Sequence, residues 1–146
     1  MRYYLILSVI VLIGCKPEET ANSIVEKSMK YHDPANSWDQ FSGTLSIALD
    51  MPDRPNRKSL VAIDNVTSDF ILTEYIEQDT IVRGLQGDSC LLSLNGQTEF
   101  DEETKIKHRL TCERAKMYHD YYTYLYGLPM KLVDPGTLID PVYEEV

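Results

Sequence analysis

Residues Lys105–Leu132 read KIKHRLTCERAKMYHDYYTYLYGLPMKL, and this stretch decides the fold because it predicts a long helix that needs a surface to cover. Wound at about 100° per residue, it separates into an apolar and a polar side, as an amphipathic helix does. Gly127 and Pro129 should end the helix, because glycine suits the turn after a helix and proline cannot extend one. The apolar side holds Ile106, Leu110, Met117, Tyr121, Tyr124 and Leu125, and the polar side holds Glu113, Lys116, His119, Asp120 and Thr123.

The chain before this helix predicts the surface that the helix covers. Between residues 44 and 51, apolar and polar side chains alternate with a period of two, which is typical of a half-buried strand. Strands in sequence, joined by short turns, predict an antiparallel meander whose apolar face is turned toward the helix. The further strand segments are Ser59–Asn65, Phe70–Ile76, Asp79–Leu85 and Cys90–Leu94.

Two predictions concern the ends of the folded part. Ser23 and Glu26 match a capping box, which places a short amphipathic helix at residues 23–32. After the long helix, Met130–Val133 and Thr137–Tyr143 are candidates for further strands. The sequence therefore predicts an α+β fold, in which an antiparallel sheet is covered by a long amphipathic helix and preceded by a short one.

The size and charge of the chain limit what it binds. With 146 residues it suits one domain with a real core. Its formal charge is −9, and removing a leader that contains Arg2 would bring this to −10. An acidic domain does not follow a phosphate backbone, and a domain without a basic patch does not dock on anionic lipid. Neither nucleic acid nor an anionic membrane surface is expected as a partner of the folded part.

The start of the chain is expected to be a targeting signal and not part of the folded domain. Met1–Arg2 is a short positive segment, and the apolar segment Tyr3–Ile13 is too short for a roughly 30 Å hydrocarbon core. The tetrapeptide LIGC resembles the lipobox of bacterial lipoproteins, in which the cysteine is acylated and becomes the new N-terminus. The expected division is a lipoprotein signal peptide at residues 1–14, a lipid attachment site at Cys15, a tether at residues 15–22 and a single domain at residues 23–146.

The lipobox implies a place in the cell envelope, with the protein held to a membrane through its N-terminal lipid. In similar lipoproteins, an aspartate directly after the acylated cysteine resembles an inner-membrane retention signal. This chain has Lys16 at that position, so the resemblance points to the outer membrane, facing the periplasm. Glu18 and Glu19 resemble the acidic tags of surface-exported lipoproteins, which makes the cell surface the alternative.

Three segments after the predicted strands resemble one group of lipid-anchored proteins. They are Cys112–Tyr118 (CERAKMY), Tyr121–Leu132 (YYTYLYGLPMKL) and Asp134–Thr137 (DPGT). With the order of elements from about Ser23 onward, they resemble an uncharacterised branch of the LolA/LolB-like lipoprotein-localisation fold. The resemblance implies a strongly curved, incomplete barrel that holds acyl chains in an apolar cavity plugged by helices. Members of this branch are longer, so the chain resembles a shortened or truncated member.

No residue pattern predicts catalysis, a metal site or a cofactor. On one helix His108 and His119 would lie about 16 Å apart, which is too far for one metal ion. His108 with Cys112 supplies only two ligands, fewer than a closed zinc site needs. Ser89 lacks the flanking glycine of a nucleophile elbow, and no histidine is placed by sequence to activate it. The chain is therefore expected not to be an enzyme.

The tyrosines of the long helix allow two interpretations. They can pack on the sheet as core, or they can wall an apolar pocket with their hydroxyls at its mouth. Arg114 lies toward the apolar side and either extends to solvent or meets a ligand headgroup or a buried carboxylate. The expected pocket residues are Tyr118, Tyr121, Leu125, Leu45, Ile47, Leu49 and Arg114.

Cys90 and Cys112 remain once Cys15 is lipidated, and an oxidising compartment predicts a disulfide between them. One observation opposes this prediction, because the helical wheel turns Cys112 away from the apolar side. Either the helix begins after Cys112, or Cys90 lies in a segment that crosses the outer side of the helix.

Two functions are compatible with these features. The first is an anchored, non-enzymatic protein that binds a lipid or another lipophilic ligand between sheet and helix. The second is a structural or interaction lipoprotein with a filled core that contacts another envelope component. A pocket beneath the helix distinguishes the two.

Overall fold

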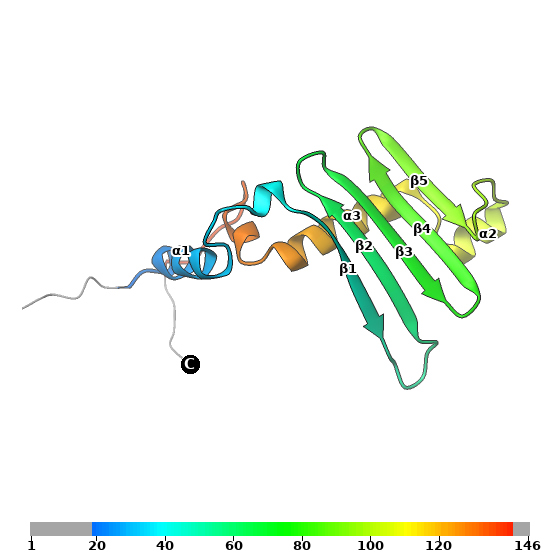
Figure 1. The fold of residues 1–146 in the computed structure, drawn as a ribbon, viewed down its shortest axis with the longest axis horizontal. Coiled ribbons are helices and arrows are strands. Elements are labelled where there is room, and N and C mark those ends of the chain that lie inside the picture. The colour runs from blue at the N-terminus through cyan, green and yellow to red at the C-terminus, as the bar shows by residue number, and fades with distance from the viewer. Residues whose placement is uncertain (1–18, 142–146) are drawn as a thin grey trace, which may run out of the picture.

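The computed structural model describes residues 19–141, in which five antiparallel strands form an open, curved sheet with one long helix behind one face and a short helix off to the side (Figure 1). The α+β architecture expected from the sequence is confirmed, including the short N-terminal helix and the long helical cover. In chain order the elements are α1 (Ala21–His32), the 3-10 helix η1 (Trp38–Gln40), β1 (Ser42–Leu49), β2 (Arg57–Asp64), β3 (Asp69–Ile76), β4 (Asp79–Gln86), β5 (Ser89–Leu94), α2 (Glu102–His108), α3 (Cys112–Gly127) and the 3-10 helix η2 (Met130–Val133).

The strands pair in the order β1-β2-β3-β4-β5, so the sheet is the expected meander. Side chains of a strand alternate between the two faces, so residues paired across the strands share a face. The helix-facing side is defined by one row across the sheet: Leu45, Val61, Leu72, Arg83 and Leu92. Asn95 and Gly96 have φ angles of 52° and 83°, which makes the turn after β5 that their sequence predicted.

The helical cover spans Glu102–Gly127, but it is interrupted where the sequence predicts one continuous helix. Arg109 takes a left-handed conformation, with φ 52° and ψ 47°, and ends α2. A new helix then starts at the cap Thr111, whose hydroxyl accepts a hydrogen bond from the backbone N–H of Arg114. The break turns Leu110 inward, where it is only 2% exposed, and α3 passes behind the sheet (Figure 1).

The face of α3 that packs on the sheet is not the apolar side assigned from the sequence. Ala115 and Tyr122 are buried against the sheet, at 0% and 6% exposure, and Ala115 lets the helix backbone approach closely. Cys112 lies three residues before Ala115 and so shares its side of the helix, which is the side that the disulfide ties to β5. Of the residues assigned to the apolar side, Leu110 is buried, and the others are exposed: Ile106 76%, Met117 42%, Tyr121 55%, Tyr124 50% and Leu125 45%.

The core lies between α3 and the middle of the sheet. It is filled, since Val61, Phe70 and Leu72 are 0% exposed. Burying each large apolar side chain contributes roughly 1.5–3 kcal/mol. The buried cluster consists of Val61, Ile63, Phe70, Leu72 and Tyr122, with Phe41, Leu45, Ile47 and Tyr118 packed against it.

The first helix begins earlier than its sequence predicted. Thr20 is the N-cap, and its hydroxyl accepts from the backbone N–H of Ser23 while the Ser23 hydroxyl accepts from the N–H of Thr20. The capping box is therefore Thr20 with Ser23, and not Ser23 with Glu26. The competing cap is three residues upstream, so Ala21 and Asn22 belong to the helix and not to the tether.

The segment after α3 differs from the prediction as well. Met130–Val133 is a 3-10 helix and not a strand, and residues 137–140 form no strand. Gly127 ends α3, but it does not adopt the left-handed turn that was expected of it. A Cβ atom at Gly127 would lie 2.6 Å from Cζ2 of Trp38, so glycine is needed here for close packing.

The expected signal peptide, Cys15 and most of the tether lie outside the described residues. Within residues 19–141, no helix has the length and the apolar composition needed to cross a membrane.

Candidate functional site

The helix α3 leaves one edge of the helix-facing side of the sheet uncovered. Within the described residues, α3 packs on β4 and, to a smaller extent, on β3 and β5. Leu45, Ile47 and Leu49 of β1 point to the same side but are only half-buried. Leu45 and Ile47 touch the core cluster from its edge. These three residues, which we call the β1 strip, form a partly exposed apolar surface.

Tyrosine rings of α3 lie between the helix and this margin of the sheet. Tyr122 is in the core cluster, and its ring forms a T-shaped pair with the ring of Tyr121 at a centroid distance of 5.2 Å. Tyr118 stacks on Tyr122 at 6.2 Å and is half-buried. Tyr121 and Leu125 remain exposed. Of the predicted pocket residues, Tyr118, Leu45 and Ile47 therefore contact one cluster, whereas Tyr121 and Leu125 face solvent next to it.

Charged side chains are buried beside these tyrosines. Glu74 of β3 and Arg83 of β4 are each 3% exposed and form an ion pair. Arg57 of β2 places Nη1 3.2 Å from the other oxygen of Glu74. One carboxylate is thus shared by two guanidinium groups. Isolated charges are costly to bury, so this sharing makes the arrangement tolerable.

A third arginine joins this group through an aromatic ring. The guanidinium carbons of Arg83 and Arg114 lie 5.5 Å and 6.0 Å from the centre of the Tyr118 ring, within range of cation–π attraction. Nη1 of Arg114 lies 3.0 Å from the sulfur of Met117. We call Arg57, Glu74, Arg83 and Arg114 the arginine cluster. Its formal charge is +2.

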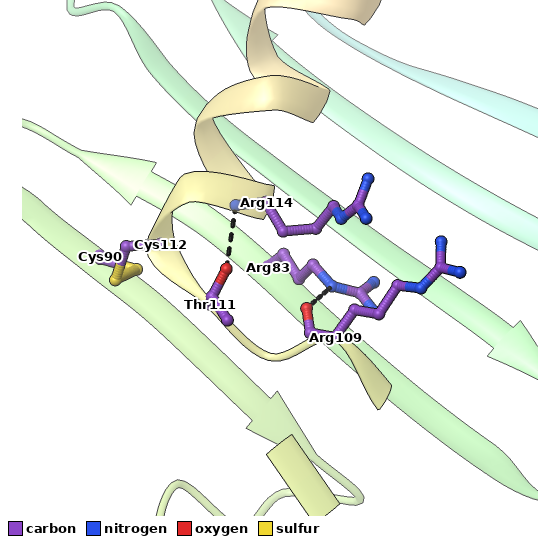
Figure 2. The surroundings of a disulfide bond; sticks show 6 residues. All are labelled: Arg83, Cys90, Arg109, Thr111, Cys112 and Arg114. Atoms are coloured by element: carbon purple, nitrogen blue, oxygen red, sulfur yellow. Dashed lines mark hydrogen bonds between the residues drawn. A yellow bond between two sulfur atoms is a disulfide. The ribbon is translucent and has the colours of Figure 1, made fainter. Parts of the chain in front are cut away.

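Arg83 also fastens the break between α2 and α3. Its Nε donates to the carbonyl of Arg109 at 3.2 Å, and its Nη2 donates to the carbonyl of His108. Figure 2 shows Arg83 beneath this bend, with the Arg109 and Arg114 side chains extending past it, away from the disulfide. All three nitrogens of Arg83 are therefore engaged, and this arginine is part of the fold.

Two donor atoms in this region lack such engagement. Within residues 19–141, Nε of Arg57 and Oγ of Ser59 are buried without a hydrogen-bond partner. Both residues lie on the helix-facing side of β2, two positions apart. Burial raises the pKa of the nearby Tyr122 hydroxyl, Arg57 acts to lower it, and Glu74 raises it further. The surroundings of Tyr122 thus combine low polarity with fixed charge.

The structure brings Cys90 and Cys112 together in a disulfide, with their Cα atoms 5.8 Å apart (Figure 2). This is an ordinary Cα separation for a disulfide. From the sequence, the helical wheel turned Cys112 away from the apolar side, which opposed the disulfide. In the structure Cys112 starts α3 on the side that faces the sheet, so the objection does not hold. Closing a loop with a sequence separation of 22 stabilises the fold by about 3 kcal/mol through the unfolded chain.

Hollows elsewhere do not contain the expected pocket residues. None of those described here, all within residues 19–141, is lined by the β1 strip, Tyr118, Tyr121, Leu125 or Arg114. An apolar hollow of about 490 Å³ follows the edge of β5 and is lined by residues of both sheet faces, including Leu91, Leu92 and Phe100. A more polar hollow of about 320 Å³ includes His119, Asn65 and Ser68.

The residues considered for metal binding or catalysis are placed apart. His108 has Nδ1 3.9 Å from Asp79, and His119 has Nδ1 2.9 Å from Asp120. Cys112 is held in the disulfide. Ser89 is exposed at the start of β5. Within residues 19–141, no three histidine, cysteine, aspartate or glutamate side chains gather as metal ligands.

The sequence analysis missed three members of the arginine cluster. Arg57, Glu74 and Arg83 all occupy inward positions of strands, and Glu74 and Arg83 lie there between apolar residues that the period of two places on the helix-facing side. A charged residue at an inward strand position is a signal for a buried ion pair or a ligand site, because such residues are rarely buried alone. That signal was present in the sequence, most clearly for Glu74 and Arg83.

Comparison with known proteins gives one match, to a family of unknown function, DUF6503, which covers residues 1–146. No curated protein and no solved structure matches the chain.

Proposed function

The chain belongs to this family of unknown function, and we propose that it is a lipid-anchored, non-enzymatic lipoprotein of the cell envelope that binds a lipophilic ligand. The ligand lies on the helix-facing side of the sheet, between the β1 strip and the tyrosines of α3. The lipid on Cys15 holds the protein to the outer membrane, with the folded part in the periplasm.

The anchoring part of the proposal rests on the first fifteen residues. An apolar segment after Arg2 that ends in Leu-Ile-Gly-Cys resembles a lipoprotein signal. A disulfide fits an oxidising compartment, which agrees with export. The resemblance to the LolA/LolB-like fold supports the same location and a ligand with acyl chains.

One observation carries the ligand part of the proposal: the β1 strip stays partly exposed at the edge of the core cluster, which Tyr118 of α3 also contacts. Leu45, Ile47 and Leu49 are half-buried, and Tyr121 and Leu125 next to the core are 55% and 45% exposed. An apolar chain on this surface would gain about 0.8 kcal/mol for each buried methylene. A chain of about ten carbons therefore binds usefully, even after ordering costs of several kcal/mol.

The filled core changes the form of the proposed site. Phe70 and Leu72 leave no room beneath the middle of α3, so the ligand lies along an open strip and not in a closed cavity. The same filling favours the second function, an interaction lipoprotein whose exposed α3 face contacts another envelope component. The two functions differ in whether a small lipophilic molecule binds the purified protein.

A fluorescent fatty-acid probe tests the proposal on the full-length, lipidated protein kept soluble in amphipol. We expect Tyr121→Glu to weaken probe binding about tenfold, because a charge beside the β1 strip must be desolvated when the apolar chain binds. The fold should survive, since Tyr121 is 55% exposed, and circular dichroism checks this.

Two matched variants locate the effect. Tyr31→Glu changes an exposed tyrosine of α1, and Phe100→Glu changes a residue of the hollow beside β5. Neither should alter probe affinity. If Phe100→Glu weakens binding while Tyr121→Glu does not, the ligand belongs to the β5 hollow. Absence of probe binding to the wild type contradicts the proposal and favours the interaction lipoprotein.

A further inference from the structure

We infer that the lipophilic ligand carries an anionic end group, a carboxylate or a phosphate, which binds Arg57 and Ser59. This inference rests on the proposed function and adds the chemical class of the ligand. It follows from two hydrogen-bond donors without a partner among the described residues, from the net positive charge of the arginine cluster and from the apolar residues beside the two donors.

The unused donors come first. Ser59 is 1% exposed, and its hydroxyl has no partner among the described residues, nor does Nε of Arg57. A buried polar group without a hydrogen bond costs stability, so such groups are rare unless something else binds them. Two unpartnered donors on one face of one strand match the two oxygens of a carboxylate or of a phosphate.

The charge of the cluster points to an anion in particular. Glu74 balances only one of the two guanidinium groups that contact it, those of Arg57 and Arg83. The carbonyls of His108 and Arg109 occupy the other nitrogens of Arg83, which leaves Arg57 as the less engaged of the pair. Arg114 adds a third positive charge across the Tyr118 ring. A water molecule satisfies donors without changing the net charge, whereas an anion satisfies them and also reduces the positive charge of the cluster.

The neighbours of the two donors explain why the ligand is amphipathic. The strand register places Arg57 between Leu49 and Ile76, and Ser59 between Ile47 and Glu74. An anion bound at Arg57 and Ser59 thus has the β1 strip directly beside it. The end group is held by the cluster while the hydrocarbon continues along Ile47 and Leu49.

Three ligands of equal chain length separate the end groups: decanoate, decyl phosphate and decanol, each displacing the fluorescent probe from the full-length protein in amphipol. At least one anionic ligand should bind the wild type about tenfold more tightly than decanol does, which is the factor expected from one charge-assisted hydrogen bond. The tighter of the two anions identifies the end group. Equal affinities of all three ligands would overturn the inference.

Ser59→Ala gives a sharper test, because stability and affinity should change in opposite directions. The variant removes a buried, unpaired hydroxyl, so its melting temperature should equal or exceed that of the wild type. The same change should weaken anion binding about tenfold and leave decanol binding unchanged. If a bound water satisfies Ser59, the melting temperature falls and anion affinity stays as it was, and the inference is then wrong.

Arg57 has a matched control in the next residue. Lys58 carries the same charge on the same strand but is exposed on the opposite face. Arg57→Gln should therefore reduce anion affinity at least about tenfold, while Lys58→Gln leaves it unchanged. Equal losses in both variants would show a general charge effect and contradict the site. If no ligand binds the wild type, the proposed function itself fails; if decanol binds as well as the anions, only this inference fails.

Discussion

Cys15→Ala should remove the protein from the membrane fraction and leave a precursor that keeps residues 1–14. The acyl groups on this cysteine are the proposed membrane anchor, and each methylene they bury contributes about 0.8 kcal/mol. Within residues 19–141 no helix is long and apolar enough to span a membrane. Detergent phase partitioning, with intact mass of the purified protein, measures both effects.

Cys112→Ala serves as the matched control for this experiment. It also removes a thiol, but that thiol lies in the disulfide with Cys90. The control protein should still be cleaved and should still enter the detergent phase. A Cys15→Ala variant that partitions as the wild type does would show that the lipobox interpretation is wrong.

Glu74→Ala should destabilise the folded part by about 3–5 kcal/mol, the usual effect of removing one partner from a buried ion pair. Arg83 is 3% exposed and would keep its charge without the carboxylate that balances it. Arg57, whose side chain is 29% exposed, is able to turn toward water. Urea unfolding measures the loss, which is a large part of the 5–15 kcal/mol typical of a domain.

Two further variants separate charge from packing in this result. Glu99→Ala removes an exposed carboxylate and should change stability by less than about 0.5 kcal/mol. The variant Glu74→Gln keeps the size of the side chain but removes its charge, and it should lose most of the same stability because Arg83 again lacks a balancing carboxylate. A single Glu74→Ala variant as stable as the wild type would mean that the cluster is already hydrated.

The sheet was predictable because short strand-like segments follow one another with clear breaks. Apolar and polar residues alternate with a period of two in β1, and short polar turns separate the strands that follow. The resulting meander needs only local pairing of successive strands. The long helical segment was visible for a similar reason, since it follows directly and contains no proline before Pro129.

The buried face of α3 was not predictable from its apolar side chains alone. Tyrosines occur all round this helix, so the hydrophobic pattern has no single maximum. Ala115 and Cys112 decide the face through close approach and through the disulfide. The break at Arg109 was equally hidden, because no glycine or proline marks it and Arg83 holds it from another strand.

The candidate site was half visible in the sequence. The β1 strip and Tyr118 were expected near one another, and the structure joins Leu45 and Ile47 of the strip to Tyr118 through the core cluster. Arg57 and Glu74 were overlooked, because the pattern was read for apolar residues and not for the charged residues at inward positions. Their pairing depends on the register of β2 with β3, which the sequence does not specify directly.

Native mass spectrometry of the full-length protein purified from an envelope fraction tests the central claim most directly. The account predicts a second mass above that of the acylated chain, which is released on collisional activation and corresponds to an anionic amphiphile. Ser59→Ala should reduce the occupancy of this adduct, and Lys58→Gln should not. A wild-type protein that carries only its covalent lipid, and that still takes up no decanoate, decyl phosphate or decanol when these are added, would contradict the account.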